Sequence, residues 1–382
     1  MSKYVFFTPT WGKTVGGTAK VARGLLYAIK DLVPDSELFV FASDMSGEVD
    51  VDGVCLDGKI CGSRGLFCLF SLRRLCPDVI HCQGRVHQLL IGYIYKLLFK
   101  PSVKLIFSFY TQPVFKSFLP GDENLSVPRF TLFSAIKRQL SVFLLNRADV
   151  VVANSRSLAD NIKLFLSSGL RREISVIPSG VEDPIFDQNE AEKFSAKYSL
   201  NQCFPVFLSV GVFSWDWKVA GFLLLLESFP AVIKEFPSAR LVIVGDGRYS
   251  YLLKAKVEEL ALKEHVILTG NLRNTFVPLS VSHIYCHLAL NESSSVSIIE
   301  AMVCGKPIVV SRAGGNAELI VSGKNGLVVE PDRVCVEEAM LRLARDTAFS
   351  DHLGASAKAD ASDRYKWPAI ARQYLKIYSN HG

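Results

Sequence analysis

The sequence lacks the spacings that mark metal-binding and disulfide-rich proteins. Its 382 residues include nine cysteines, and no two of them form a Cys-x-x-Cys pair. Common zinc sites need such pairs or paired histidines nearby, so we expect no zinc site. An odd number of cysteines is also unlike a disulfide framework and suits a reducing compartment.

Long apolar runs are missing too. A membrane-spanning helix needs about 18 or more consecutive apolar residues, and the chain has no such run. The first apolar run, Tyr4–Phe7, ends just before Pro9 and is too short for a signal peptide. We therefore expect a cytoplasmic protein whose first residues form a buried strand.

Acidic residues are scarce in one part of the chain. Residues 59–147 contain 13 Lys and Arg against three acids, a local charge of +10 in a chain of net charge +6. Basic and apolar residues interleave there, and the mean hydropathy of the chain is +0.25. This pattern suits an anionic membrane surface, although a core-facing helix with a solvated basic edge would give it as well. We expect residues 59–147 to contact the inner face of the membrane.

Nucleic acid is not an expected partner, because the basic region shows no helix-turn-helix, RNP or zinc-finger spacing. Nicotinamide oxidoreductases are excluded on similar grounds. Their Gly-x-Gly-x-x-Gly spacing is absent from both glycine loops, the one after Val15 and the one after Val244.

Short apolar runs alternate with longer helical patterns along the whole chain. This alternation predicts parallel sheets covered on both faces by helices. A polar break at Asp183–Cys203 divides it into two Rossmann-like halves, whose strand ends should form a ligand-binding cleft. The predicted strands are Val5–Phe7, Leu38–Phe41, Val79–His81, Leu105–Phe109, Val150–Ala153, Ile174–Ile177, Val206–Val210, Arg240–Val244, Val266–Leu268, Ile284–Leu288, Ile308–Val310 and Gly326–Val329.

The stretch Asn291–Val310 is the most informative part of the sequence. Glu292 follows an apolar run, Glu300 opens a helical run eight residues later, and Ser293–Ser297 occupy the helix entry. Backbone N–H groups at a helix entry favour an anion. One carboxylate could accept sugar hydroxyls and the other the ribose hydroxyls of a nucleotide. Two glutamates alone could equally be a helix N-terminal charge and a solvated helical residue.

The residues that follow this pair resemble those of a known family. Gly305-Lys306-Pro307 and Gly314-Gly315-Asn316-Ala317-Glu318 come next. With the two glutamates they resemble the nucleotide-sugar module of the retaining GT-B glycosyltransferases of family 4. Similar motifs run along nearly the whole chain: Val15–Gly17, Pro77–His81, Arg147–Ser155, Val176–Val181, Leu208–Gly211 and Leu241–Gly247.

The resemblance implies an α/β protein of GT-B fold, with two Rossmann-like domains facing across a cleft. It implies an acceptor-binding domain at 1–190, a nucleotide-sugar domain at 191–362, and a C-terminal helix at 363–382 that packs back on the first domain. The implied activity is retaining, metal-independent hexosyl transfer without a cofactor. The donor is a nucleotide diphosphate sugar, UDP-sugar favoured. The acceptor is a glycan or lipid-linked molecule in bacterial surface polysaccharide synthesis (O-antigen, lipopolysaccharide or capsule).

Roles for single residues also follow from the resemblance. Glu292 and Lys218 are the implied catalytic pair: Glu292 contacts the donor sugar and Lys218 neutralises the diphosphate. Glu300 binds the ribose. The other implied donor-binding positions are Gly16, Gly17, Gly211, Arg248, Asn271, Leu272, Ser295 and Val296, and the acceptor-side positions are His81, Tyr110 and Thr111.

The chain departs from the family pattern at two of these places. The family's Gly-Arg is Gly211-Val212 here, so Lys218 lacks the usual Arg beside it unless Arg248 substitutes. The family's Phe-Gly between the two glutamates is Ser294-Ser295. Two alternatives therefore stay open: a GDP-mannose-type mannosyltransferase, and a catalytically silent GT-B protein that binds a sugar.

Overall fold

The computed structural model describes residues 2–12, 17–46, 54–59, 68–111, 132–166 and 169–379. These residues form two compact units. The described residues up to 180 and those from 367 onward make the first, and residues 181–366 make the second. Val181 is buried in the core of the second unit, and its N–H donates to the Tyr365 carbonyl at 2.8 Å. The division therefore falls before the polar stretch that begins at Asp183, and residues 181–190 belong to the second unit.

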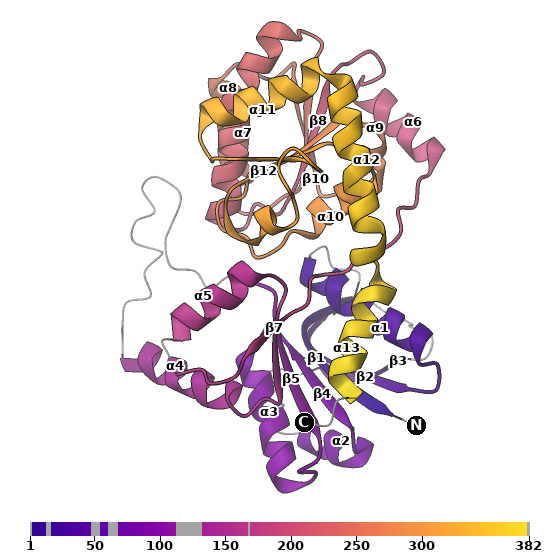
Figure 1. The fold of residues 1–382 in the computed structure, drawn as a ribbon, viewed down its shortest axis with the longest axis vertical. Helices are drawn as coiled ribbons and strands as arrows, with labels where there is room; N and C mark the ends of the chain where they lie inside the picture. Colours follow the sequence, from indigo (N-terminus) through magenta and orange to yellow (C-terminus); the bar gives the residue numbers. More distant parts are fainter. Residues whose placement is uncertain are drawn as a thin grey trace. The chain divides into compact units, whose positions relative to one another are not determined.

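The first unit contains a seven-stranded parallel sheet in the order β3-β2-β1-β4-β5-β6-β7 (Figure 1). All six strands predicted for this half are present. The edge strand β3 was not predicted, because Asp57 and Gly58 interrupt its apolar pattern. The strands are β1 (Lys3–Gly12), β2 (Glu37–Ser46), β3 (Val54–Lys59), β4 (Val79–Gln83), β5 (Lys104–Phe109), β6 (Val150–Ala153) and β7 (Ile174–Val176).

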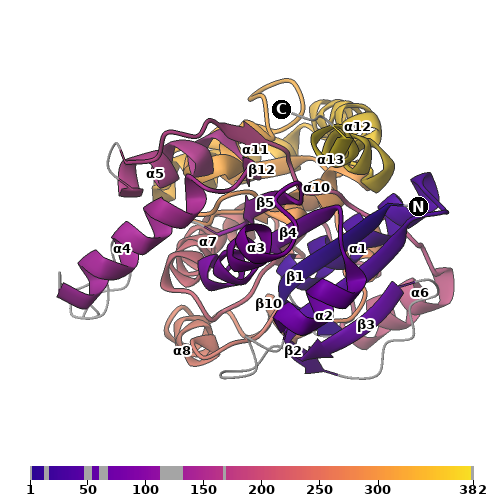
Figure 2. The same ribbon diagram turned by 90° about the horizontal axis from the view of Figure 1, so that it is seen from below.

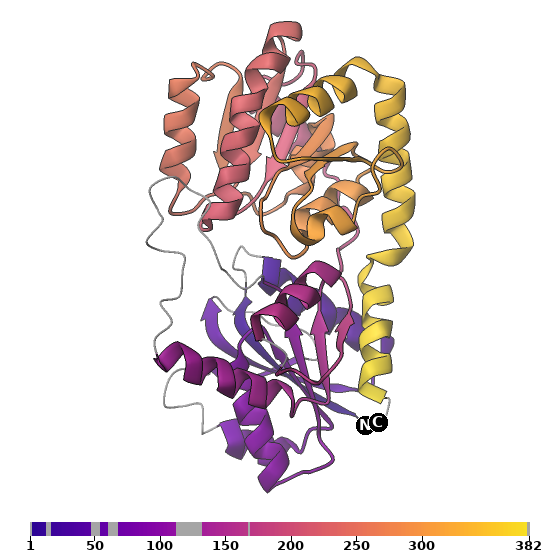
Figure 3. The same ribbon diagram turned by 60° about the vertical axis from the view of Figure 1, so that its left-hand side comes forward.

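Helices cover this sheet, and the last helix of the chain is one of them. The ring of Trp367, its first residue, fills space left free by two glycines: a Cβ on Gly24 would lie 2.1 Å from it, and one on Gly180 2.3 Å. Near the other end of the helix, the Tyr378 ring packs against that of Tyr4 near the start of β1, tilted by 54° with ring centroids 5.3 Å apart. The last helix runs beside the sheet of this unit (Figure 3). The predicted C-terminal helix that packs back on the first unit is thus present. It begins at Trp367 rather than at residue 363, because residues 363–364 still belong to the preceding helix. The helices of this unit are α1 (Gly17–Leu32), α2 (Cys68–Leu75), α3 (Val86–Leu98), α4 (Leu132–Leu145), α5 (Arg156–Leu166) and α13 (Trp367–Ser379).

The second unit repeats the architecture with a six-stranded parallel sheet in the order β10-β9-β8-β11-β12-β13. This is the Rossmann order, in which the first and fourth strands lie side by side at the centre. All six strands predicted for this half are present, so the predicted α/β class with two Rossmann-like halves is confirmed. The strands are β8 (Val206–Val210), β9 (Arg240–Val244), β10 (Val266–Gly270), β11 (Ile284–His287), β12 (Ile308–Ser311) and β13 (Leu327–Val329).

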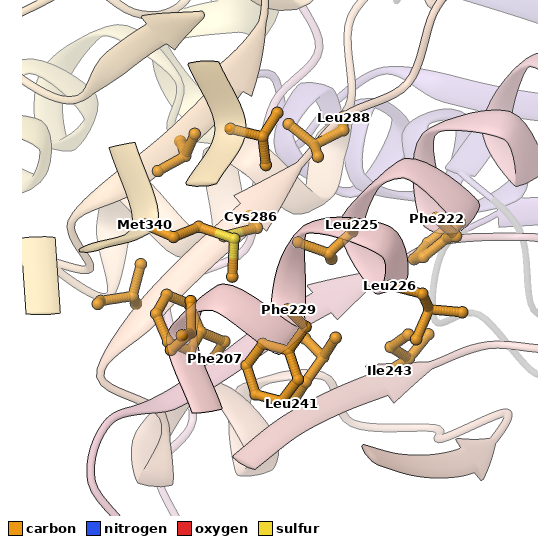
Figure 4. Packing of buried hydrophobic residues seen from close by; sticks show 14 of the residues in the cluster. Phe207, Phe222, Leu225, Leu226, Phe229, Leu241, Ile243, Cys286, Leu288 and Met340 are labelled. Atoms are coloured by element: carbon orange, nitrogen blue, oxygen red, sulfur yellow. The ribbon is translucent and has the colours of Figure 1, made fainter. Parts of the chain in front are cut away.

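A continuous apolar core joins the second sheet to the long helix α7. Phe229 of α7 packs edge-to-face on Phe207 of β8, with ring centroids 5.9 Å apart, and Leu225 and Leu241 lie beside them (Figure 4). Burial of these side chains fixes α7 against the sheet. The helices of this unit are α6 (Gln188–Lys197), α7 (Asp216–Glu235), α8 (Ser250–Glu259), α9 (Phe276–Val281), α10 (Val296–Val303), α11 (Arg333–Arg345) and α12 (Thr347–Arg364), with a 3-10 helix η2 (Gly314–Glu318).

Candidate functional site

The second sheet reverses its strand order between β8 and β11. Open α/β folds bind ligands where parallel strands end beside such a reversal. Lys218 follows β8 in the first turn of α7, and Glu292 follows β11 in the loop that leads to α10. A small cavity lies beside them, lined by Ser209, Lys218, Gly221, Phe222, His287, Leu288 and Ala289.

The carboxylate of Glu292 lies between two nitrogen groups. Lys218 Nζ is 2.5 Å from Oε1, and His287 Nε2 is 2.7 Å from Oε2. Burial by itself would raise the pKa of Glu292. The Lys218 charge and the His287 hydrogen bond outweigh burial and hold that pKa well below its ordinary value. Glu292 is therefore an ionised, largely buried carboxylate, and the structure brings the two residues predicted as the catalytic pair into contact.

A close approach of α7 to the end of β11 brings Lys218 within reach of Glu292. A Cβ on Gly221 would lie 2.0 Å from the Leu288 carbonyl oxygen, so a larger residue would push the helix away. The Leu290 N–H donates to the Trp217 carbonyl at 3.1 Å, which ties the loop to the first turn of α7. Glycine at 221 is thus a condition for the Lys218–Glu292 contact.

The backbone of Glu292 is held from the opposite side by the glycine pair that begins η2. The Gly315 N–H donates to the Glu292 carbonyl at 2.8 Å. Gly314 has a φ of +59°, and a Cβ there would lie 2.1 Å from the Glu292 carbonyl oxygen. Only glycine combines this backbone conformation with so close an approach. The Gly-Gly motif seen in the sequence therefore acts by fixing Glu292.

Glu300 lies in the second turn of α10 and is buried. Its Oε2 accepts a hydrogen bond from the Thr275 hydroxyl at 2.8 Å. At the entry of the same helix the Ser295 N–H donates to Asn316 Oδ1 at 2.9 Å. Ser294 Oγ and Asn316 Nδ2 are buried and have no hydrogen-bond partner in the structure. The entry of α10 therefore holds polar atoms able to bind a ligand.

Sequence reasoning missed the residues that connect these parts. His287 and Tyr285 are alternate residues of β11, and the Tyr285 hydroxyl lies 3.3 Å from His287 Nδ1 and 2.8 Å from Ser297 Oγ. A hydrogen-bonded path therefore runs from Glu292 through His287 and Tyr285 to the first turn of α10. The sequence did contain a signal for these residues. Tyr285 and His287 are hydrogen-bonding residues two positions apart in an apolar strand, and His287 precedes Glu292 by five residues.

The other predicted donor-binding residues of this unit lie in the segments that follow β8, β9 and β10 and at the start of α10. Gly211 follows β8, and its N–H donates to the Val244 carbonyl at 3.0 Å. Arg248 is exposed and stacks on Tyr249, with its guanidinium carbon 4.6 Å from the ring centroid. Asn271 is exposed after β10, and Leu272 packs partly into the core. Val296 is the first residue of α10.

In the first unit, Gly17 begins α1, and Gly16 lies outside the described residues. His81 is fully buried in β4, with Nδ1 2.8 Å from the Tyr378 hydroxyl and Nε2 2.7 Å from the Ser108 hydroxyl. Nδ1 is thus bonded to α13 and Nε2 to β5, and the acceptor-side role of His81 stays a prediction.

The remaining acceptor-side residues follow β5. The Tyr110 hydroxyl is 3.4 Å from that of Tyr374, and Thr111 is exposed. The indole N–H of Trp11 and the side-chain amides of Gln83 and Gln88 are also buried near the strand ends without a hydrogen-bond partner in the structure. Sequence reasoning did not single out these three.

Neighbouring helices of the first unit carry exposed apolar and basic side chains. The apolar ones come from α2, α3, the residue after α3, and α4, and α4 extends away from the edge of the sheet (Figure 2). Arg73 lies over Phe99 at 5.4 Å, and Arg147 over Phe143 at 4.6 Å. The exposed apolar residues are Phe70, Leu97, Leu98, Phe99, Ile136, Leu140 and Phe143. We call these, with Arg73 and Arg147, the basic apolar surface.

Two properties of the described residues bear on membranes and metals. Their helices include none with the length and apolarity required to cross a bilayer. Nor do three or more His, Cys, Asp or Glu side chains converge there as ligands for a metal ion.

Two family models match the chain in succession. The model described as Glycosyltransferase Family 4 matches residues 62–183, and the model described as Glycosyl transferases group 1 matches residues 190–360. Together they span most of both units, and the second includes Lys218, Glu292 and Glu300.

Relatives of known activity and a solved structure are similar as well. N-acetyl-alpha-D-glucosaminyl L-malate synthase of Bacillus anthracis is 22% identical over 79% of this chain and 74% of that protein. The GDP-mannose-dependent alpha-(1-6)-phosphatidylinositol monomannoside mannosyltransferase of Mycolicibacterium smegmatis is 25% identical over 61% of this chain and 63% of that protein. The crystal structure of Anabaena Alr3699/HepE in complex with UDP and glucose covers all of both chains, with a TM-score of 0.75 and 21% identity. This last likeness establishes the fold.

Proposed function

The chain belongs to glycosyltransferase family 4 and has the GT-B fold, and we propose that it transfers a sugar from a UDP-sugar, with retention of configuration, to a glycan or lipid-linked acceptor. The observation that carries this proposal is the arrangement around Glu292 and Glu300. Two carboxylates and a lysine stand where the central strands of the second sheet end, beside a helix entry with buried polar atoms. Such a site can bind hydroxyl groups and a diphosphate together.

Each group of this site has a role in the proposed reaction. Glu300 accepts the ribose hydroxyls, and Glu292 accepts hydroxyls of the donor sugar. The Lys218 ammonium and the entry of α10 stabilise the negative charge that grows on the leaving diphosphate. The bond between the anomeric carbon and the phosphate oxygen breaks as the acceptor oxygen bonds to that carbon on the same face. The acceptor proton passes to the leaving phosphate oxygen, so the reaction needs no carboxylate nucleophile.

No metal has a role in this scheme, because Lys218 and the helix entry carry the positive charge. Transfer measured in excess EDTA tests that part directly. Undiminished rates support it, and a rate that falls in EDTA and returns with Mg²⁺ refutes it.

UDP is favoured over GDP as the leaving nucleotide because a protein of the same fold binds UDP with glucose. A relative whose name specifies GDP-mannose supports the second candidate, a mannosyltransferase. The acceptor and the cellular location of the protein are proposed from the charge of the first unit. The basic apolar surface suits an anionic membrane, and a lipid-linked acceptor of bacterial surface polysaccharide synthesis at the inner face would match it.

The first experiment is a thermal-shift screen of the full chain with UDP, GDP, ADP, CMP and dTDP, without metal. A nucleotide that binds only the folded chain raises the Tm. We expect UDP to raise it, and we expect Glu300→Gln to abolish most of the rise. Glu264→Gln, at an exposed position before β10, is the matched control and should respond like the wild type.

The same screen separates the alternatives. A rise with GDP alone selects the mannosyltransferase. A rise with UDP but no hydrolysis or transfer of any UDP-sugar selects the silent sugar-binding protein. No rise with any nucleotide refutes the proposed function.

A further inference from the structure

The Lys218–Glu292 contact raises a question about what happens when a donor binds. The ammonium that the proposed function assigns to the diphosphate is already engaged by Glu292 Oε1 at 2.5 Å. A diphosphate carries more negative charge than one carboxylate and competes for this lysine. When Lys218 turns toward it, a largely buried carboxylate loses its cationic partner. Burying an ionised carboxylate without a partner costs free energy unless another hydrogen-bond donor contacts it.

His287 is placed to be that donor. It binds the other carboxylate oxygen, Oε2, at 2.7 Å, so its contact does not depend on Lys218. An ionised carboxylate only accepts hydrogen bonds, so His287 Nε2 carries the hydrogen. One partner can therefore leave Glu292 while the other stays.

The two partners differ in their freedom to move. Lys218 has a long side chain, 19% exposed, that lines the cavity. His287 is 3% exposed and is the last residue of the buried strand β11. Its ring lies nearly parallel to that of Tyr285 at 17°, and its Nδ1 is 3.3 Å from the Tyr285 hydroxyl. The flexible partner can leave for a ligand, and the packed one cannot.

The backbone around Glu292 is held as well, as the Gly315 N–H bond and the close contact of Gly314 show. The Ala289 carbonyl in the same loop accepts a bond from the Ser311 hydroxyl at 2.8 Å. With the loop fixed on both sides, the direction of the Glu292 carboxylate is set by its two side-chain partners.

We propose that His287 is a positioning residue of the donor site, which keeps the Glu292 carboxylate in place while Lys218 exchanges it for the donor diphosphate. This inference rests on the proposed function. It has a consequence for binding alone: removing the His287 donor makes the release of Lys218 unfavourable, and nucleotide binding weakens although the hydrogen bond that is lost is one to Glu292.

The test is calorimetric titration of the full chain with UDP. In His287→Phe, which keeps a ring but no donor, the Kd should rise about 10- to 100-fold, the range for a lost hydrogen bond to a charged group. His287→Gln keeps an N–H donor and should recover most of the affinity.

The decisive variant is the double substitution His287→Phe with Glu292→Gln. In this variant, release of Lys218 leaves a neutral amide and not an unpaired buried charge. The UDP affinity of the double variant should therefore return to within about threefold of that of Glu292→Gln alone, because the effects of two contacting residues are not additive. A merely structural role for His287 predicts the opposite, because a misfolded pocket is not repaired by a second substitution.

His283→Gln is the matched control. His283 stands just before the other end of β11, and its Nδ1 accepts from the Val206 N–H at 3.0 Å. It should bind UDP like the wild type. The inference is overturned if His287→Phe binds UDP as tightly as the wild type, or if Glu292→Gln fails to rescue it. A wild type that binds neither UDP nor GDP refutes the proposed function, and this role falls with it.

Discussion

His81 gives the first unit a pH-dependent stability whose size follows from its surroundings. The imidazole is fully buried, and both nitrogens are hydrogen-bonded to the hydroxyls of Tyr378 and Ser108. Burial lowers the pKa of His81 to about 3, from an ordinary value of 6.5. The ring therefore stays neutral in the folded chain, whereas it titrates near pH 6.5 in the unfolded chain.

The sign follows from proton binding. Between about pH 6.5 and pH 3 the unfolded chain binds a proton at His81 that the folded chain does not, so the free energy of unfolding falls as the pH falls. The stability that depends on a neutral His81 is fully present above pH 6.5. It declines by about 1.4 kcal/mol per unit below that pH, which amounts to about 2 kcal/mol at pH 5.

Urea unfolding followed by circular dichroism at pH 7.5 and pH 5.0 measures this loss. The wild type should lose about 2 kcal/mol more than His81→Leu between the two values. Tyr378→Phe keeps His81 buried and is the control: its free energy of unfolding should be lower at both pH values, with the pH dependence of the wild type. If wild type and His81→Leu lose equal amounts, the reasoning about a neutral, buried His81 is refuted.

Further predictions concern single contacts. Gly314→Ala should lower the free energy of unfolding by about 1–3 kcal/mol through backbone strain, and because its Cβ meets the Glu292 carbonyl oxygen, UDP affinity measured by titration should fall as well. Unchanged binding would show that Gly314 does not position Glu292. Trp367→Ala removes the ring that packs against Gly24 and should destabilise the first unit by about 3–5 kcal/mol. A change below 1 kcal/mol in urea unfolding would contradict that role of α13.

Much of the fold could be predicted because its signal is local. Strands such as Val150–Ala153 are short apolar runs between turn residues, and the structure has that strand with the same bounds. The edge strand Val54–Lys59 could not be predicted in this way, since only its pairing with β2 makes it a strand. The composition of Asp183–Cys203 predicts only a polar break between the two halves. This stretch contains α6, whose Phe194 reaches the core of the second unit, a contact that composition does not reveal.

The sequence by itself determined which residues the proposed reaction uses. Glu292, Glu300, Lys218 and the Gly-Gly pair stand at spacings that local motifs preserve, so they can be recognised without coordinates. Only the tertiary structure decided how they act. Lys218 and Glu292 are 74 residues apart in number and 2.5 Å apart in space, joined by the close approach of α7 to β11 at Gly221. The same folding turned His287 from a strand residue into a partner of Glu292, and placed His81 under α13. Contacts of this kind depend on packing between distant segments, which no local spacing encodes.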